Sequence, residues 1–331
     1  MSVDSSDEPQ QEESLPEAKL APQVFDVEFT EEELTSPSKK ADIGQAEPRP
    51  ALDLPTASPT PDGRARVVTV INQKGGVAKT TTVINVAARL ATFGNRVLVV
   101  DCDAQGNCAT GMGIDKSRVR AGTRTLLLEP EKAINARHAT AVENLHLVVG
   151  DRSLVGVEEE LISQLGRERK LAEGLEPLLP HYDIVLIDTP PSLGQVTINA
   201  LVAADAVLIP VQTEYFALEG LALLASTIRE IRRRLNPRLG VDAVVLTMHA
   251  PTLLNAQVAS QIRETFPDLV VDPPVRRNIR IAEAPSHGVP IHVHAPNSAG
   301  GRDYLALAKA LAERWGLASE VVGGWGRTSE R

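Results

Sequence analysis

The residues best suited to chemistry form a short loop rich in glycine and lysine. It spans residues 72–82, reads NQKGGVAKTTT, and separates an apolar run from a helical pattern. Glycines let backbone N–H groups turn inward around an anion, and the N-terminus of the following helix adds partial positive charge. The segment therefore predicts a phosphate-binding loop, although Gln73 and Ala78 stand where the general pattern GxxxxGK[ST] has glycine.

Two residues of this loop match the pair that contacts phosphate and metal in such sites. Lys79 should reach the β- and γ-phosphates, and the Thr80 hydroxyl should ligate Mg²⁺. Lys74 lies outside this cradle, five positions earlier, and needs another role. The predicted nucleotide-binding residues are Lys74, Gly75, Gly76, Val77, Ala78, Lys79, Thr80 and Thr81.

Aspartates follow two further apolar runs. Asp101 and Asp103 come after the run at 97–100, and Asp188 ends the run at 184–187. The carboxyl ends of parallel strands face the crevice in which such sheets bind ligands, and Asp188 is placed as a Walker B aspartate. With the loop, these carboxylates predict nucleotide hydrolysis at one sheet edge.

The elements that must position these residues are visible as apolar runs. The predicted strands cover 67–71, 97–100, 145–149, 184–187, 206–211 and 241–246. Helical spacing follows the first run, at 83–90, and the fifth, at 221–235. Strands that are apolar throughout and alternate with amphipathic helices predict an α/β, doubly wound, mostly parallel sheet over residues 64–317.

The charge of this 331-residue chain is unevenly distributed. Its net charge is −9, but residues 1–63 hold 15 acidic and 4 basic residues, whereas residues 64–331 hold 28 acids and 30 bases. The first 63 residues are poor in apolar side chains and are predicted to be a disordered acidic extension; within it, 24–34 could be a short partner-binding motif. Residues 318–331 are predicted to be a flexible tail. A nearly neutral domain does not exclude nucleic acid.

Several classes of protein are disfavoured by what the sequence lacks. The start is acidic without an apolar signal core, and the longest apolar run is too short for a membrane span, so we expect a cytoplasmic protein. Cys102 and Cys108 match no zinc or iron–sulfur spacing and are interpreted as small packing residues. His292 and His294 alternate without a third metal ligand and are interpreted as surface histidines.

Four segments together resemble the ParA/Soj chromosome- and plasmid-partitioning ATPases with their deviant Walker A loop. They read KGGVAKTT at 74–81, DCDAQGN at 101–107, PVQTEYFALEG at 210–220 and EAPSHG at 283–288, and the similarity extends from about Val67 to about Ala312. The last two segments separate this family from relatives that share only the phosphate loop. His287, in the last of them, has no role that its chemistry alone reveals.

The resemblance implies an ATP-bound sandwich dimer with Mg²⁺. Lys74 matches the signature lysine that reaches the partner's ATP, and Asp103 matches the carboxylate that positions the attacking water. Asp101 is implied beside the metal and Asp188 as holding it through water, so Thr80, Asp101 and Asp188 form the expected metal site. One departure concerns Ala78, which replaces a glycine: a helical backbone there would accept the methyl group, whereas a positive φ would strain it.

The family also binds double-stranded DNA without sequence preference and is stimulated by a ParB-like partner, which implies a nucleoid-associated protein. Arginine contacts to phosphate would suffice for such binding. The expected DNA-binding residues are Arg229, Arg232, Arg233, Arg276, Arg277 and Arg280. A second departure is that segment 249–255, HAPTLLN, lacks the basic residue that relatives commonly carry.

Two alternatives remain beside a partitioning ATPase. A MinD-like enzyme that cycles on membranes would need a basic amphipathic C-terminal helix, which residues 318–331 do not supply, so no membrane partner is expected. A scaffold would use nucleotide only to lock its dimer and would recruit polar or cell-division proteins through the acidic extension. Asp103 and Lys74 argue against lost hydrolysis, though not against an added scaffold role.

Overall fold

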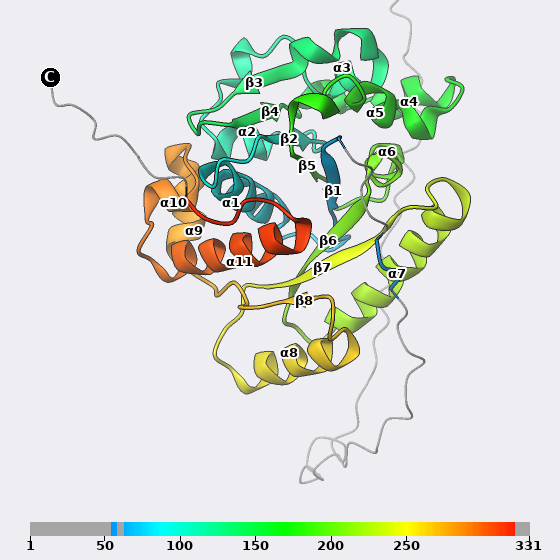
Figure 1. Ribbon diagram of the computed structural model, residues 1–331. Helices are drawn as coiled ribbons and strands as arrows, with labels where there is room; N and C mark the ends of the chain where they lie inside the picture. Colours follow the sequence, from blue (N-terminus) through cyan, green and yellow to red (C-terminus); the bar gives the residue numbers. More distant parts are fainter. Residues whose placement is uncertain (1–53, 58–62, 322–331) are drawn as a thin grey trace, which may run out of the picture. The chain divides into compact units, whose positions relative to one another are not determined.

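The computed structural model describes residues 54–57 and 63–321. Among them, eight strands form one sheet in the spatial order β3-β4-β2-β5-β1-β6-β7-β8 (Figure 1). All neighbouring strands are parallel except β3 and β4. The strands are β1 Arg66–Val70, β2 Val97–Asp101, β3 Arg137–Ala139, β4 Leu145–Val148, β5 Ile184–Asp188, β6 Ala206–Gln212, β7 Gly240–Thr247 and β8 Val270–Val271. The predicted α/β fold with a mostly parallel sheet is confirmed.

Helices cover both faces of this sheet, and each face has its own buried apolar group. One group holds side chains of α3 to α8, and the other holds side chains of α1, α2, α10 and α11, with Ile281 of α9 packed against it. The helices are α1 Lys79–Thr92, α2 Asn107–Gly111, α3 Thr123–Leu128, α4 Val157–Ile162, α5 Lys170–Leu175, α6 Gln195–Ala203, α7 Ala217–Arg234, α8 Leu253–Thr265, α9 Ile279–Glu283, α10 Ile291–His294 and α11 Ala299–Trp315.

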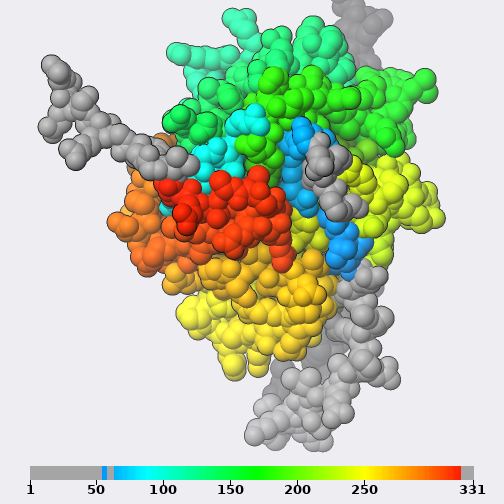
Figure 2. Space-filling model, viewed as in Figure 1, coloured from blue at the N-terminus to red at the C-terminus, as the bar shows by residue number. Residues whose placement is uncertain are grey.

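The two helices expected from apolar spacing are α1 and α7. Val83, Val86 and Leu90 of α1 are buried, as are Leu221 and Ile228 of α7. In Figure 2 the side chains of α11 occupy the centre of the viewed face and leave only small areas of α1 visible. Because α11 covers one side of α1 and the sheet covers the other, the middle of α1 is buried, and its partly exposed residues lie near its two ends.

Both ends of the described chain pack on the amino-terminal edge of the sheet. Pro55 O accepts a hydrogen bond from the Val241 N–H at 2.7 Å, and Leu54 is 6% exposed. Ala318 exchanges two hydrogen bonds with the Asn95 side chain. The folded region therefore begins by residue 54, inside the segment expected as extension, and includes the first residue of the expected C-terminal tail.

The other expectations for the termini, including the motif at 24–34, lie outside the described residues. Within residues 54–57 and 63–321, no helix combines the length and apolar character needed to cross a bilayer.

The start of α1 differs from the expectation for Ala78. Its backbone is left-handed, with φ 67° and ψ 34°, instead of helical. Gly76, two residues earlier, also has a positive φ, of 75°. The loop must reverse its curvature before α1 begins, and this geometry favours glycine at both positions. Ala78 is therefore strained by its methyl group, by roughly 1–2 kcal/mol.

Replacing Ala78 by glycine should stabilise the nucleotide-free protein. Relief of strain exceeds the extra unfolded-state entropy of glycine, so the Ala78→Gly variant should gain about 0.5–1 kcal/mol in free energy of unfolding, measured with urea. Ala306→Gly, in the middle of α11, is the matched control and should lose about 1 kcal/mol. A loss of similar size in both variants would contradict the strain at Ala78.

Candidate functional site

The loop between β1 and α1 places Lys79 deep in the site. The Lys79 side chain is mostly buried, and its ammonium donates to the Lys74 carbonyl oxygen at 3.3 Å. Burial lowers the pKa of Lys79, while the charges of Asp188 and Asp103 act in the opposite direction. A cation is thus held between the loop backbone and two carboxylates, which suits it to bind a phosphate chain.

Two aspartates end neighbouring strands at the same level. The parallel register pairs Asp101 of β2 with Asp188 of β5, and both are fully buried. The Thr80 hydroxyl donates to Asp188 Oδ2 at 2.6 Å, which connects the start of α1 to this pair. Burial and the charge of Asp188 raise the pKa of Asp101 well above its usual range, and burial raises the pKa of Asp188 to about 6.

The donors around this pair fit a small, hard cation. Asp188 Oδ1 is buried and accepts no hydrogen bond from any described residue, so it is left for a ligand. Carboxylate and hydroxyl oxygens are the ligands that Mg²⁺ prefers. Thr80, Asp101 and Asp188, the three residues expected from the sequence, therefore lie together in an arrangement suited to that ion.

Asp103 lies at the mouth of this group and is partly exposed. Its backbone N–H donates to Asp101 Oδ1 at 3.0 Å, and its own Oδ1 accepts from the Gln105 N–H at 2.9 Å. The chain then turns into α2 through Gly106, where φ is 62° and a Cβ atom would lie 2.3 Å from the Gly150 carbonyl oxygen. This tight turn fixes Asp103 beside the metal-binding oxygens.

Lys74 does not contact the other loop residues through its side chain. It forms an ion pair with Glu214, which follows β6, and the two side chains are 53% and 46% exposed. Glu214 belongs to segment 210–220, which the sequence marked as family-specific without assigning a role to this residue. An exposed pair of this kind contributes at most about 1 kcal/mol, so Lys74 can leave it at little cost.

The six arginines expected to bind DNA do not form one group. Arg229, Arg232 and Arg233 lie on α7, whereas Arg276, Arg277 and Arg280 lie at or near α9, which covers the opposite face of the sheet. Arg232 and Arg276 are held by distant parts of the fold. Arg232 donates to the carbonyl oxygens of Thr56 and Leu239, and Arg276 forms a bidentate pair with Asp303 of α11 at 2.6 and 3.0 Å.

The remaining arginines are closer to solvent. Arg233 pairs with the exposed Glu230 and Arg280 with the partly exposed Glu283, each one helical turn away, and Arg277 is exposed. The Arg277 N–H donates to the His249 carbonyl oxygen at 3.0 Å, which attaches its segment to the end of β7. Helical spacing identified which arginines avoid the apolar stripe, but it carries no information on which face of the sheet a helix covers.

The expectation of two surface histidines is wrong. His292 is 8% exposed and His294 is partly buried, because 291–294 is a short helix that contacts α1 and α11. Burial, and then the charge of Arg89, lower the pKa of His292 to about 4. His287, which had no assigned role, stacks on His294 with ring centroids 4.6 Å apart.

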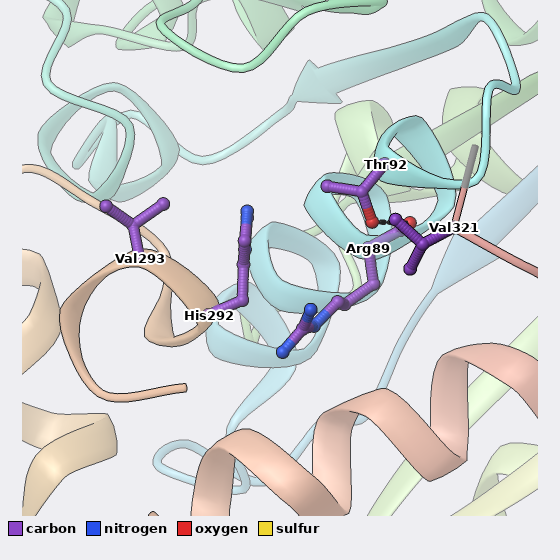
Figure 3. A pocket seen from close by; sticks show the side chains of 5 residues that line it. All are labelled: Arg89, Thr92, His292, Val293 and Val321. Atoms are coloured by element: carbon purple, nitrogen blue, oxygen red, sulfur yellow. Dashed lines mark hydrogen bonds between the residues drawn. The ribbon is translucent and has the colours of Figure 1, made fainter. Parts of the chain in front are cut away.

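A cavity of about 340 Å³ lies next to His292, at the C-terminal end of α1 (Figure 3). Its lining residues are Arg89 and Thr92 of α1, His292 and Val293 of α10, and Val321. None of the predicted site residues lines this cavity, so it is separate from the phosphate loop.

Both cysteines are buried, as expected of packing residues, and are free thiols. They differ in their surroundings. Cys102 packs in the apolar group of one face, whereas Cys108 Sγ lies 3.6 Å from Asp188 Oδ2 on the other. No local sequence pattern indicates that contact, because it depends on where the start of α2 lies relative to the end of β5.

Comparison with known proteins gives consistent matches. An AAA domain model matches residues 65–241. The chain is 46% identical over 248 residues to the sporulation initiation inhibitor protein Soj of Bacillus subtilis, covering 75% of this chain and 98% of Soj. It is 44% identical over 252 residues to the chromosome partitioning protein ParA of Caulobacter vibrioides, covering 75% and 94%.

A solved structure shares the architecture. Cobyrinic acid a,c-diamide synthase from Mycobacterium smegmatis, crystallised with ADP and magnesium, has a TM-score of 0.66 and 32% identity, covering 78% of this chain and 100% of the synthase. The two relatives named above are matched over almost their whole length and above 40% identity. With the phosphate loop and paired strand-end aspartates in place, the chain belongs to the ParA/Soj family of P-loop ATPases.

Proposed function

We propose that this chain is an ATP-hydrolysing switch for chromosome or plasmid partitioning. In the proposed cycle, an ATP-bound sandwich dimer binds DNA without sequence preference and is released after hydrolysis that a ParB-like partner stimulates. The observation that carries the proposal is the convergence of Lys79, Thr80, Asp101, Asp103 and Asp188 at the carboxyl edge of β1, β2 and β5.

The residues around the phosphate loop divide the work of hydrolysis. Lys79 and the backbone N–H groups of 75–81 bind the phosphate oxygens, which orients the chain of phosphates for attack. When bound, Mg²⁺ neutralises phosphate charge, and Thr80, Asp101 and Asp188 would hold it. Asp103 is partly exposed at the mouth of the site, so it can accept a proton from an attacking water and orient it.

Lys74 completes the site from the partner subunit. Its side chain is exposed and points away from its own cradle to Glu214, so it is available to a second copy of the chain. A lysine supplied in trans would neutralise charge that develops on the phosphates, as an arginine finger does. Hydrolysis would then require dimerisation.

The proposed DNA binding depends on exposed arginines, and the six candidate arginines lie on two different faces of the sheet. Arg277 and Arg280 lie near the carboxyl edge that carries the ATP site, because the Arg277 N–H bonds to His249 after β7. Binding there could respond to dimerisation. The α7 group lies on the other face of the sheet, and Arg232 in it is engaged by carbonyl oxygens. We therefore favour the group at α9 as the DNA surface.

Replacing Asp103 should trap the ATP state. The Asp103→Ala variant should keep nucleotide affinity within about threefold, lose at least about 100-fold in turnover, and form a long-lived dimer with ATP, because only water positioning is removed. Single-turnover hydrolysis and size-exclusion chromatography measure the two effects. Normal turnover, or no dimer with retained ATP binding, would show that Asp103 is not the water-positioning residue.

Replacing Lys74 should separate binding from dimerisation. The Lys74→Gln variant should bind ATP as a monomer and lose dimerisation and hydrolysis, because the trans charge is absent. Lys309→Gln, an exposed lysine of α11, is the matched control and should behave like the unmodified chain. Unchanged turnover in Lys74→Gln refutes the trans role.

Charge reversal should identify the DNA surface. Arg277→Glu with Arg280→Glu should weaken ATP-dependent binding to unrelated duplexes at least tenfold, and the unmodified chain should lose affinity steeply with salt. Arg229→Glu with Arg233→Glu, on α7, is the comparison and should have a smaller effect. The reverse order of effects in co-sedimentation would move the surface to α7.

The buried aspartate pair should make stability depend on pH in the absence of Mg²⁺ and nucleotide. Because the pKa of Asp188 rises to about 6 in the folded state, folding favours its protonated form. The free energy of unfolding should therefore fall as pH rises from about 4 to 6. Asp188→Asn removes this ionisable group, so the stability of the variant relative to the unmodified chain should rise by up to about 3 kcal/mol between pH 4 and 6.

Asp183→Asn supplies a control of opposite sign. Although burial alone would raise the pKa of Asp183, hydrogen bonds from Arg96 lower it. This variant should be less stable than the unmodified chain at pH 5 to 7, and the difference should shrink as pH falls below about 4, where the carboxyl of the unmodified chain becomes protonated. Urea unfolding in EDTA at pH 3 to 7 measures both, and a flat difference for Asp188→Asn would contradict the raised pKa.

A further inference from the structure

A buried thiol lies inside the group of oxygens that suits a metal. One ligand atom each from Asp101, Cys108 and Asp188 lies within 4.8 Å of the other two, and all three residues are buried. The Cys108 N–H donates to Asp101 Oδ2 at 3.1 Å, and its Sγ lies 3.6 Å from Asp188 Oδ2. Three rigid elements, the ends of β2 and β5 and the first turn of α2, thus meet at one point.

The thiol is not needed for magnesium. Mg²⁺ is a hard ion that takes oxygen ligands, which Thr80, Asp101 and Asp188 already provide. Thiolate sulfur instead favours zinc and other ions of similar softness. Cys108 therefore adds a donor that discriminates in favour of a different metal.

The spacing fits tetrahedral zinc. With Zn–S of about 2.3 Å and Zn–O of about 2.1 Å, a tetrahedral ion holds its sulfur and oxygen ligands about 3.6 Å apart. The Cys108 thiol donates a hydrogen bond to Asp188 Oδ2 with Sγ and Oδ2 3.6 Å apart, so an ion could replace the thiol proton without changing this separation. Asp188 Oδ1, which is buried and accepts no hydrogen bond from the described residues, is an independent sign that this point suits a cation.

We infer that Asp101, Cys108 and Asp188 form a binding site for a thiophilic divalent cation such as Zn²⁺, which competes with Mg²⁺ in the same place. Binding replaces the thiol proton: the S–H bond breaks, a Zn–S bond forms, and the proton leaves to solvent without any change of oxidation state. The Thr80 hydroxyl, which donates to Asp188 Oδ2 at 2.6 Å, can supply the fourth ligand.

An occupied site would affect the proposed reaction. Zn²⁺ on Asp101 and Asp188 takes the oxygens that would hold Mg²⁺, so hydrolysis should stop; this consequence rests on the proposed function, whereas metal binding does not. The chain would then sense excess zinc through Cys108, a residue outside the phosphate loop.

Cobalt is the probe, because Co²⁺ bound to thiolate gives an intense near-ultraviolet charge-transfer band. The nucleotide-free full chain should develop this band with one Co²⁺ per chain, and equimolar Zn²⁺ should remove it. Cys108→Ala and Cys108→Ser should lack the band and bind Zn²⁺ at least about tenfold more weakly. Cys102→Ala, which removes the other buried thiol, should retain both.

Each result has a definite meaning. The proposed site is wrong if the unmodified chain shows no band, or if folded Cys108 variants show an equal band. Thermal melting of both Cys108 variants tests which of them are folded, and we expect at least one to be. Metal binding without any ATP hydrolysis would overturn the proposed function alone. Normal hydrolysis that Zn²⁺ inhibits equally in Cys108→Ala and Cys102→Ala would overturn the role of Cys108.

Discussion

The structure depends on burying two carboxylates side by side. Asp101 and Asp188 are paired in register at the ends of adjacent parallel strands, and neither is exposed. Two negative charges in a poorly solvated place repel each other and cannot both remain ionised without compensation. The Lys79 ammonium and the Thr80 hydroxyl, both in the first turn of α1, supply part of this compensation. Strand register, helix start and loop shape are therefore linked by a single electrostatic requirement.

That requirement gives the site its preference for a metal-bound phosphate ligand. Without a cation, the raised pKa values of the pair keep a proton at the site near pH 5. Because the unfolded chain gives up this proton more readily, the folded state loses stability as pH rises. A divalent ion held by Asp101 and Asp188 would remove the repulsion, and a phosphate chain would balance the charges of the ion and Lys79. Ligand binding and folding stability are coupled through the same two aspartates. Cys108 enters this balance because its thiol contacts one of them.

The sequence was informative where a pattern is local. Apolar runs located six strands, and the loop with its strand-end aspartates located the site, because strand ends in a parallel sheet meet at one edge. Strands β3 and β8, with three and two residues, are too short to show a recognisable apolar pattern in the sequence. The left-handed backbone at Ala78 depends on how the loop closes onto α1. The placement of the arginines on two faces, the burial of His292 and the contact of Cys108 with Asp188 depend on tertiary packing, which no local pattern records.

The sheet also separates the site from the points at which the described chain ends. Leu54–Ala57 packs beside the start of β7, and Ala318 pairs with Asn95 just before β2, so both lie at the amino-terminal edge. The phosphate loop lies at the carboxyl edge, beyond strands of five residues such as β1 and β2, which span about 17 Å. At ordinary ionic strength, charges separated by this distance are largely screened. Charged groups next to these two attachment points are therefore largely screened from the phosphate loop.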